Sequence, residues 1–266
     1  MAQIDTQVLP LLPLSSGVVL PGMVVTLTIE SDDARRALEA SETSDGELLL
    51  VPRVGSRYAR IGTVAKVEDV GRLRNGLDAL VIRGLYRAVV GTGVAGTGDA
   101  IWVQFEPSSD PETSSDRARS LAKEYRAVLE TIIESRGLPG VADFLRGIED
   151  PGQIADTAGY SPDLSFEQKV EVLETVDVEA RLEKVLTWAK ELLADVELKD
   201  KIRTDVREGM EKNQREYLLR QQMDAIRKEL GDDSEDNVVE EYRKKIADAN
   251  MPQNAREEAE RELGRL

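Results

Sequence analysis

Three glycines form the sequence pattern that comes nearest to a known binding motif. Gly91, Gly93 and Gly96 have the spacing G-x-G-x-x-G. This pattern binds a dinucleotide when a helix follows it, because the N-terminal amides of that helix meet the pyrophosphate. The residues that follow here, AIWVQF, are typical of a strand instead. We therefore expect a flexible hairpin loop at these glycines and no cofactor-binding residue.

Carboxylates and serines could also carry chemistry, but their surroundings argue against it. Pairs such as Glu257/Glu258 and Asp232/Asp233 lie in polar segments, without the apolar walls that acid–base residues need. No G-x-S-x-G nucleophile elbow is present, and no S-x-x-K pattern is expected to place a serine beside a lysine. The absence of Cys and His excludes thiol nucleophiles, disulfide bonds, Cys/His zinc sites and imidazole acid–base catalysis. We expect no catalytic residue and no metal ligand, so this chain by itself is predicted not to be an enzyme.

The charge balance is informative about partners. The 266 residues include 35 Lys and Arg against 51 Asp and Glu, a formal net charge of −16. Nucleic acids and anionic membranes bind clusters of Lys and Arg, so this balance disfavours both. No apolar run approaches the ~18 residues of a membrane span, and the N-terminal segment MAQIDTQ lacks the basic region of a secretory signal. We expect a cytoplasmic location.

Residues 1–110 are predicted to form a β-rich lobe. Short apolar runs with many β-branched residues alternate with Gly and Pro, which favours a curled, mostly antiparallel sheet or small barrel. One helix is expected at 32–40, capped by its two aspartates. The expected strands are 8–14, 17–20, 23–29, 47–51, 60–70, 77–90 and 100–105.

Helical patterns follow the polar segment PSSDPETSSD. Residues 111–195 are predicted to form an all-helical bundle, and a capping box at Ser165 and Gln168 starts one of its helices. Residues 231–266 are predicted to be a helical connector with a terminal helical pair. The fold class is therefore α+β. The expected shorter helices are 116–136, 141–148, 153–158, 238–249 and 254–266.

One very long helix is predicted at 178–230. This segment has no proline and a single glycine, Gly209, and its apolar residues recur at spacings of three and four. Six acid-to-base pairs at i,i+4 can support a helix that is exposed to water and packs on little else. We therefore expect this helix to project from its domain or to brace against other subunits. Gly209 lies where the apolar stripe is thinnest. It is either a tolerated surface glycine or a hinge.

Two groups of apolar residues are candidates for binding extended polypeptides. Pro-Gly interrupts the strands near residue 21, which predicts either an ordinary strand pair with core side chains or an exposed apolar groove with an adaptable methionine. The candidates in the first lobe are Leu20, Pro21 and Met23. The candidates on the long helix, where few intramolecular partners are expected, are Met210, Tyr217 and Met223.

Two stretches resemble one protein family. LPLLPLSSGVVLPGMVVTLTI, with IGTVAKVEDV and LVIRGLYRAVV, is similar to the N-terminal substrate-binding lobe of the Lon ATP-dependent proteases. EKNQREYLLRQQMDAIRKELG, with VVEEYRKKIADANMP and EEAERELGRL, is similar to the long helix and connector of the same family. No Walker A lysine motif, sensor arginine or Ser/Lys dyad is found, so the resemblance implies that the ATPase and protease modules lie beyond Leu266.

The resemblance also implies a function. Members are hexameric, ATP-driven cytoplasmic serine proteases that degrade misfolded and tagged proteins, with ATP and Mg²⁺ used by the modules outside this chain. This chain would be the noncatalytic region that recognises misfolded or degron-bearing substrates and positions them over the ATPase ring. A structural or oligomerisation spacer that binds no substrate is the alternative. Nucleic-acid binding is a third possibility, against which the acidic charge argues.

Overall fold

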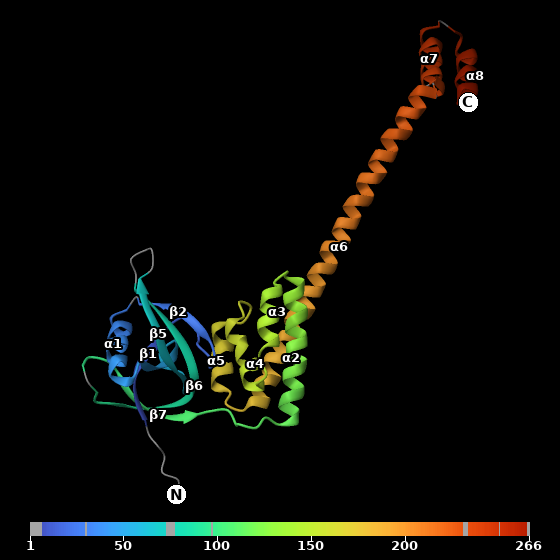
Figure 1. Ribbon diagram of the computed structural model, residues 1–266. Coiled ribbons are helices and arrows are strands. Elements are labelled where there is room, and N and C mark those ends of the chain that lie inside the picture. Colours follow the sequence, from blue (N-terminus) through green and yellow to red (C-terminus); the bar gives the residue numbers. More distant parts are fainter. Residues whose placement is uncertain are drawn as a thin grey trace. The chain divides into compact units, whose positions relative to one another are not determined.

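The computed structural model describes residues 7–29, 31–72, 78–96, 98–230, 234–249 and 251–264 (Figure 1). The chain divides into two compact units, Met1–Glu197 and Leu198–Leu266. The first unit contains a β-rich lobe and a helical lobe, and the second contains helices only. This agrees with the α+β class expected from the sequence.

The β-rich lobe is a small closed barrel. Its strands pair in the order β1-β7-β6-β5-β3, and β1 pairs with β3 in parallel, which closes the ring. The other pairings are antiparallel, with β2 added along β6 and β4 along β3. The strands are β1 (Gln7–Leu14), β2 (Val24–Thr28), β3 (Glu47–Val54), β4 (Arg57–Tyr58), β5 (Ile61–Arg72), β6 (Asp78–Val94) and β7 (Trp102–Ser108).

The core of the barrel follows from its strand pattern. β3 is a run of apolar residues that are buried from Leu48 to Pro52, because it lies between two other strands of the ring. Helix α1 (Asp32–Ser41) packs against β1 and β3 and is followed by the short helix η1 (Glu42–Ser44). The side chain of Ser31, rather than either aspartate, caps α1 by accepting a hydrogen bond from the Ala34 amide at 3.1 Å.

The helical lobe packs four helices and a 3-10 turn against the start of the long helix. They are α2 (Asp116–Ser135), α3 (Pro139–Arg146), α4 (Pro151–Asp156), η2 (Thr157–Tyr160), α5 (Phe166–Glu174) and α6 (Val178–Leu230). The predicted capping box is confirmed, with Ser165 and Gln168 bonded reciprocally. α3 and α4 each begin two residues earlier than predicted, because proline suits the first helical position.

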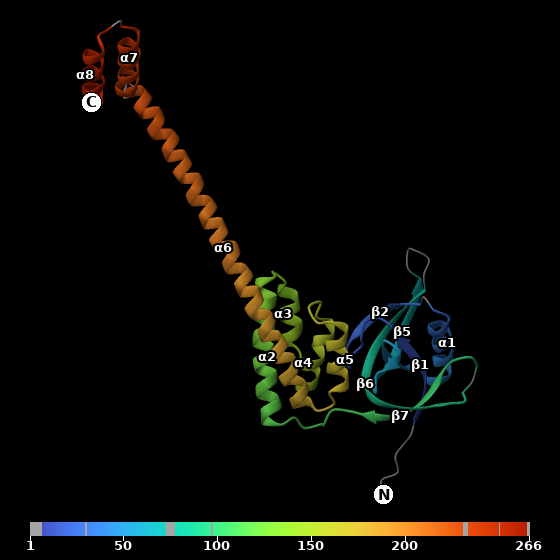
Figure 2. The ribbon, with the colours of Figure 1, turned by 180° about the vertical axis from the view of Figure 1, so that it is seen from behind.

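The two lobes of the first unit share one hydrophobic core. Both ribbon views place α5 as the helix beside the barrel, and α5 packs against β5 (Figures 1 and 2). Buried residues of the barrel, such as Leu20 and Val64, belong to the same cluster as Ile154 and Leu173 of the helices. The interface between the lobes is therefore part of the core.

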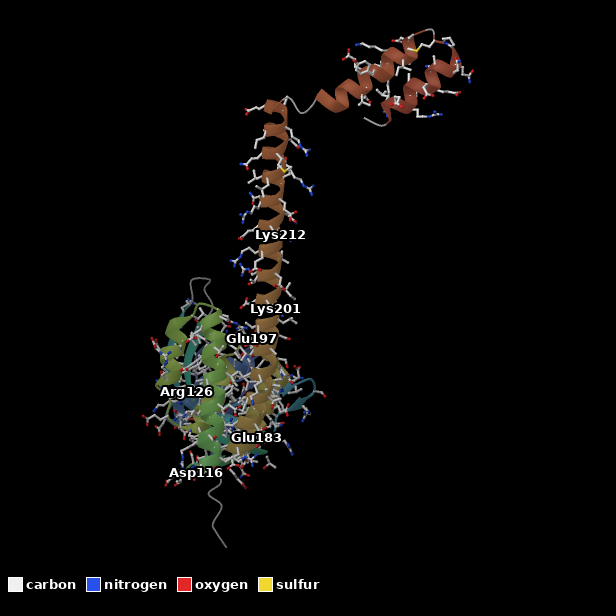
Figure 3. All side chains as sticks on the ribbon, turned by 90° about the vertical axis from the view of Figure 1, so that its right-hand side faces the viewer. Asp116, Arg126, Glu183, Glu197, Lys201 and Lys212 are labelled. Atoms are coloured by element: carbon white, nitrogen blue, oxygen red, sulfur yellow. The ribbon has the colours of Figure 1, made fainter. Side chains whose placement is uncertain are left out.

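The second unit contains the rest of α6, with α7 (Ser234–Asp248) and α8 (Gln253–Leu263). α7 and α8 pack on each other and bury Ile246 and Leu263. Every side chain of α6 from 197 to 229 is exposed, and side chains surround the helix near Lys201 and Lys212 (Figure 3). The six acid-to-base pairs at i,i+4 were expected to support this helix, but none of them is within ion-pair distance among the described residues. Exposed pairs of this kind contribute little, so the side chains remain in solvent.

Two further predictions, both within the barrel, were wrong. Residues 17–20 are not a strand, although their apolar side chains are buried. Gly91 and Gly93 lie inside β6 and not in a loop, since β6 runs to Val94 with a register shift between Val90 and Gly93. A Cβ at Gly91 would come within 2.7 Å of the Gln104 carbonyl oxygen of β7, which explains glycine at this position.

Candidate functional site

Among the described residues, the structure assembles no catalytic constellation from those considered above, and Asp232 and Asp233 lie outside the described residues. Gly93 pairs with Val103 of β7, Gly91 lies in the register shift beside the Gln104 carbonyl, and Gly96 follows the end of β6. Contrary to the expectation from the sequence, a Ser-x-x-Lys spacing is present at Ser120 and Lys123, and both residues lie on the exposed face of α2. Among the described residues, no cluster of acidic side chains is arranged to hold a metal ion, and no helix has the length and apolar composition needed to cross a bilayer.

The first group of predicted binding residues lies at the interface between the lobes. Leu20 is 0% exposed and Met23 is 4% exposed, and Pro21 is half-buried. The Met23 sulfur accepts a hydrogen bond from the Leu20 amide at 3.2 Å, and both side chains lie against Gly159 of η2. The predicted exposed groove is therefore absent in this conformation, because the helical lobe covers it. Substrate contact at these residues stays a prediction that requires the lobes to separate.

The second group is exposed on α6. Met210 is 69% exposed, and Tyr217 and Met223 are more than half exposed. The Tyr217 hydroxyl accepts a hydrogen bond from the Gln221 side-chain amide at 2.9 Å. These residues have the exposure that a contact with another polypeptide requires, and their role in substrate binding stays a prediction. Gly209 lies inside the continuous helix with open space around its Cα.

An apolar groove that sequence reasoning missed lies in the helical lobe. It has a volume of about 750 Å³ and is bounded by the C-terminal half of α2, by α3, by η2 with the loop after it, and by α6. Its size is that of a ligand-binding cleft. Its apolar and aromatic lining comprises Tyr125, Leu129, Ile132, Ile133, Leu138, Val141, Phe144, Leu145, Tyr160, Leu164, Val185, Trp188 and Leu192.

The mouth of the groove exposes large apolar side chains. Phe144 is 54% exposed and Tyr160 is 45% exposed, and their rings meet edge to face at 6.3 Å. Leu138 and Val141 are also exposed beside them. Contiguous exposed apolar surface of this kind marks binding sites on soluble proteins.

A sequence signal for this groove existed. Ala142 and Leu145 of α3 are buried, so they form the face that packs on α2. Val141 and Phe144, one position earlier in each case, form a second apolar face on the same short helix. A helix that packs on one neighbour cannot bury two apolar faces. The second apolar face of α3 therefore indicates a binding surface.

Charged residues form one rim of the groove. Arg136 at the end of α2 donates two hydrogen bonds to the Asp163 carboxylate, at 2.7 and 2.9 Å. These contacts raise the pKa of the arginine. Glu191 and Asp195 of α6 line the same groove and are exposed. The lining therefore carries one cation and three carboxylates.

A buried ion network joins the groove lobe to the barrel. Arg87 of β6 donates to the two carboxylate oxygens of Asp156 at 2.8 and 2.6 Å, and both side chains are buried. Arg181 of α6 lies 3.4 Å from the same carboxylate and also pairs with Asp110. The Val24 amide of β2 donates to the Tyr160 hydroxyl at 2.9 Å, which fixes one wall of the groove.

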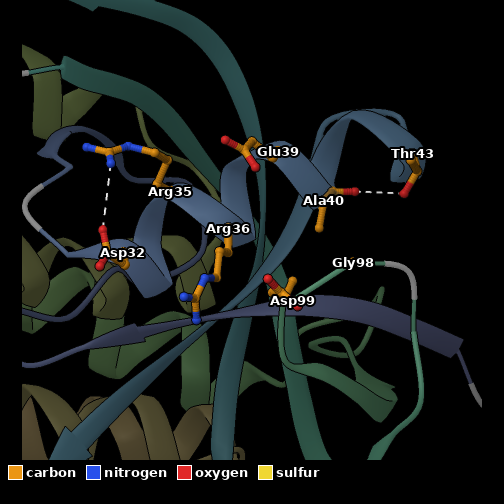
Figure 4. A pocket seen from close by; sticks show the side chains of 9 residues that line it. Asp32, Arg35, Arg36, Glu39, Ala40, Thr43, Gly98 and Asp99 are labelled. Atoms are coloured by element: carbon orange, nitrogen blue, oxygen red, sulfur yellow. Dashed lines mark hydrogen bonds and ion pairs between the residues drawn. The ribbon is translucent and has the colours of Figure 1, made fainter.

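A second hollow lies on the barrel and is polar. It is about 720 Å³ in volume and open, between α1 and the segment before β7 (Figure 4). Arg36 and Asp99 extend into it, and Asp32 and Arg35 form a 3.6 Å ion pair on its edge. Its charged side chains are exposed, and both arginines pair with neighbouring aspartates of α1, so it offers a ligand less than the apolar groove does.

Comparisons with known proteins agree with this architecture. The family described as the ATP-dependent protease La (LON) substrate-binding domain matches residues 8–191. Lon protease of Mycolicibacterium smegmatis is 45% identical over 265 residues, covering 98% of this chain and 34% of that protein. Lon protease of Escherichia coli K12 is 32% identical, covering 97% of this chain and 34% of that protein. The chain thus spans about a third of the length of these relatives.

A solved structure supports the same assignment. The N-terminal domain of Mycobacterium avium complex Lon protease superposes with a TM-score of 0.64 at 38% identity, covering 69% of this chain and 98% of that one. The family match covers the barrel, the helical lobe and the start of α6. This chain belongs to the family of Lon protease substrate-binding domains.

Proposed function

We propose that this chain recognises unfolded or tagged proteins for an ATP-dependent serine protease, and that the groove of the helical lobe holds an apolar segment of the substrate. The observation that carries the proposal is the exposed apolar lining at Leu138, Val141, Phe144 and Tyr160. Unfolded chains expose the large apolar side chains that such a groove can bury. Folded proteins keep those side chains inside.

The proposal extends to the whole protein through family membership. The chain covers about a third of its relatives, and we expect an ATPase and a Ser/Lys protease module in the remainder, with ATP and Mg²⁺ bound there. Assembly as a cytoplasmic homohexamer would place this chain over the ATPase ring. The exposed part of α6 favours a second role, in which its apolar residues contact other subunits as a spacer or coiled coil.

Crosslinking tests where substrates bind. A photoreactive residue at position 144 should label a denatured model substrate and not its native form. The same residue at position 58, where an exposed tyrosine lies on the barrel away from the groove, is the control. Probes at positions 20, 23, 210, 217 and 223 test the contacts predicted from the sequence. Equal labelling at 144 and 58, or equal labelling of native and denatured substrate, contradicts the proposal.

Binding by variants gives an independent measurement. Val141→Ser with Phe144→Ser should weaken binding of the denatured substrate, since the groove loses two exposed apolar side chains. Both side chains are exposed, so the fold should tolerate the change. Tyr58→Ser should leave binding unchanged. Unimpaired binding by the double variant assigns substrate recognition to another surface.

A further inference from the structure

The charge at the rim of the groove points to a particular kind of substrate segment. The groove is lined by Arg136, Asp163, Glu191 and Asp195, a net charge of −2. Arg136 and Asp163 neutralise each other through their paired hydrogen bonds. The uncompensated charge therefore belongs to Glu191 and Asp195.

These two carboxylates are adjacent to the apolar lining of α6. Trp188, Glu191, Leu192 and Asp195 recur at spacings of three and four, so they lie on one face of the helix over two turns. In the part of the chain that the structure describes, neither carboxylate has an ion-pair partner, and neighbouring Lys190 pairs with Glu124 at 2.7 Å. The apolar lining of α6 and the two unpaired carboxylates are therefore adjacent in the groove.

We propose that the groove selects apolar segments that carry a lysine or arginine at one end. The apolar side chains would fill the floor between α2, α3 and α6, and the cationic side chain would lie beside Glu191 and Asp195. Trp188, one turn earlier, offers an aromatic surface to the same cation. This inference rests on the proposed function, because it assumes that the groove binds polypeptide.

The chain supplies its own reporter for the test. Its two tryptophans are Trp102, which is buried in the barrel, and Trp188 in the groove. In the Trp102→Phe protein, the remaining fluorescence comes from the groove. The probes are ten-residue peptides with the same leucine and phenylalanine core and no tryptophan, which end in Lys-Lys, Gln-Gln or Glu-Glu.

The lysine peptide should bind more tightly than the glutamine peptide, and the glutamate peptide more weakly. Two partly exposed carboxylates should give a difference of roughly three- to tenfold at low salt. Glu191→Gln with Asp195→Asn should abolish the preference while the glutamine peptide still binds. The matched control, Glu197→Gln with Asp200→Asn, removes the same charge from exposed positions of α6 outside the groove and should keep the preference.

The outcomes separate the two levels of the proposal. If all three peptides change Trp188 fluorescence with equal affinity, or if the lysine preference survives neutralisation of Glu191 and Asp195, the charge selection is overturned and apolar recognition by the groove stands. If the control variant loses the preference as well, the net charge of the chain is responsible and the local assignment is overturned. If no peptide changes Trp188 fluorescence, the groove is not the binding site and the proposed function fails there.

Discussion

At the scale of single residues, the Asp156 carboxylate links the barrel to the helices of the first unit. It lies between Arg87 of the barrel and Arg181 of the long helix, and all three side chains are buried. Burial raises the pKa of Asp156, and the two arginines oppose that shift by stabilising the charged form. Removing the carboxylate would leave Arg87 buried without its charged partner, whereas Arg181 would keep its contact with Asp110.

Asp156→Asn should destabilise the protein strongly, by about 3–5 kcal/mol, because Arg87 remains buried beside a neutral side chain and Arg181 is left with Asp110 alone. Thermal or urea unfolding measures the loss. Asp143→Asn is the control, since Asp143 pairs with Arg146 on the exposed face of α3 and should contribute little. Equal stability of the two variants would show that the buried network does not hold the lobes together.

Gly159 tests the contact between the lobes. A Cβ at this position would lie 2.3 Å from the Met23 sulfur and 3.1 Å from a Leu20 methyl group. Gly159→Ala should therefore lower the free energy of unfolding by about 1–3 kcal/mol through overpacking. Gly140→Ala, where nothing lies within 4 Å, should have no such cost. Combining Gly159→Ala with Met23→Ala should cost less than the sum of the single changes.

At the scale of elements, α6 changes character along its length. Leu182, Val185 and Ala189 are buried in the first unit, whereas every side chain from 197 to 229 is exposed. Tertiary packing stabilises the first part. The exposed part depends on helix propensity and on whatever covers it in the whole protein, because isolated helices gain little stability in water.

Gly209 is the position of α6 where propensity is lowest. The structure places it inside a continuous helix with open space around it, so alanine fits without a clash. Gly209→Ala should stabilise the exposed part of the helix by about 0.5–1 kcal/mol, measured as the helicity that remains when the protein is heated.

If Gly209 is a hinge, the variant should also narrow the distribution of distances between spin labels placed on either side of it. It should slow the degradation of bulky folded substrates by the intact protease more than the degradation of short peptides. If the distance distributions have the same width in both proteins, and the degradation of both substrate classes changes equally, Gly209 is a tolerated surface glycine.

At the scale of the whole molecule, the chain combines a net negative charge with an apolar groove in its helical lobe. Its net charge of −16 opposes contact with nucleic acid and favours basic partners. Binding energy can therefore come from apolar contacts, with charge deciding between segments of similar hydrophobicity. This combination suits a region that selects polypeptides and passes them on.

The purified chain should neither hydrolyse ATP nor cleave casein-like substrates. The residue patterns of a nucleotide site and of a Ser/Lys dyad were not found in its sequence, and Ser120 with Lys123 lies on an exposed helix face. Phosphate release and peptide cleavage measure both activities, with buffer alone as the control. Turnover that co-purifies with the chain through a further column would contradict this expectation.

The sequence by itself determined most elements of the fold. Hydrophobic periodicity and the absence of proline predicted Val178–Leu230 as one helix, and the Ser165 capping box placed the start of α5. These are local properties, because caps and periods are set by residues within one or two turns. Boundaries at Pro139 and Pro151 were missed by two residues for an equally local reason.

Only the tertiary structure decided which apolar faces are covered. Periodicity shows that Leu20, Met23, Val141 and Phe144 are apolar and regularly placed, and it does not show which of them meets a partner. The helical lobe covers Leu20 and Met23 through contacts between residues more than 130 positions apart, and it leaves Val141 and Phe144 open beside Tyr160. Burial depends on such long-range contacts, so the groove emerges only when α2, α3, η2 and α6 are brought together in space.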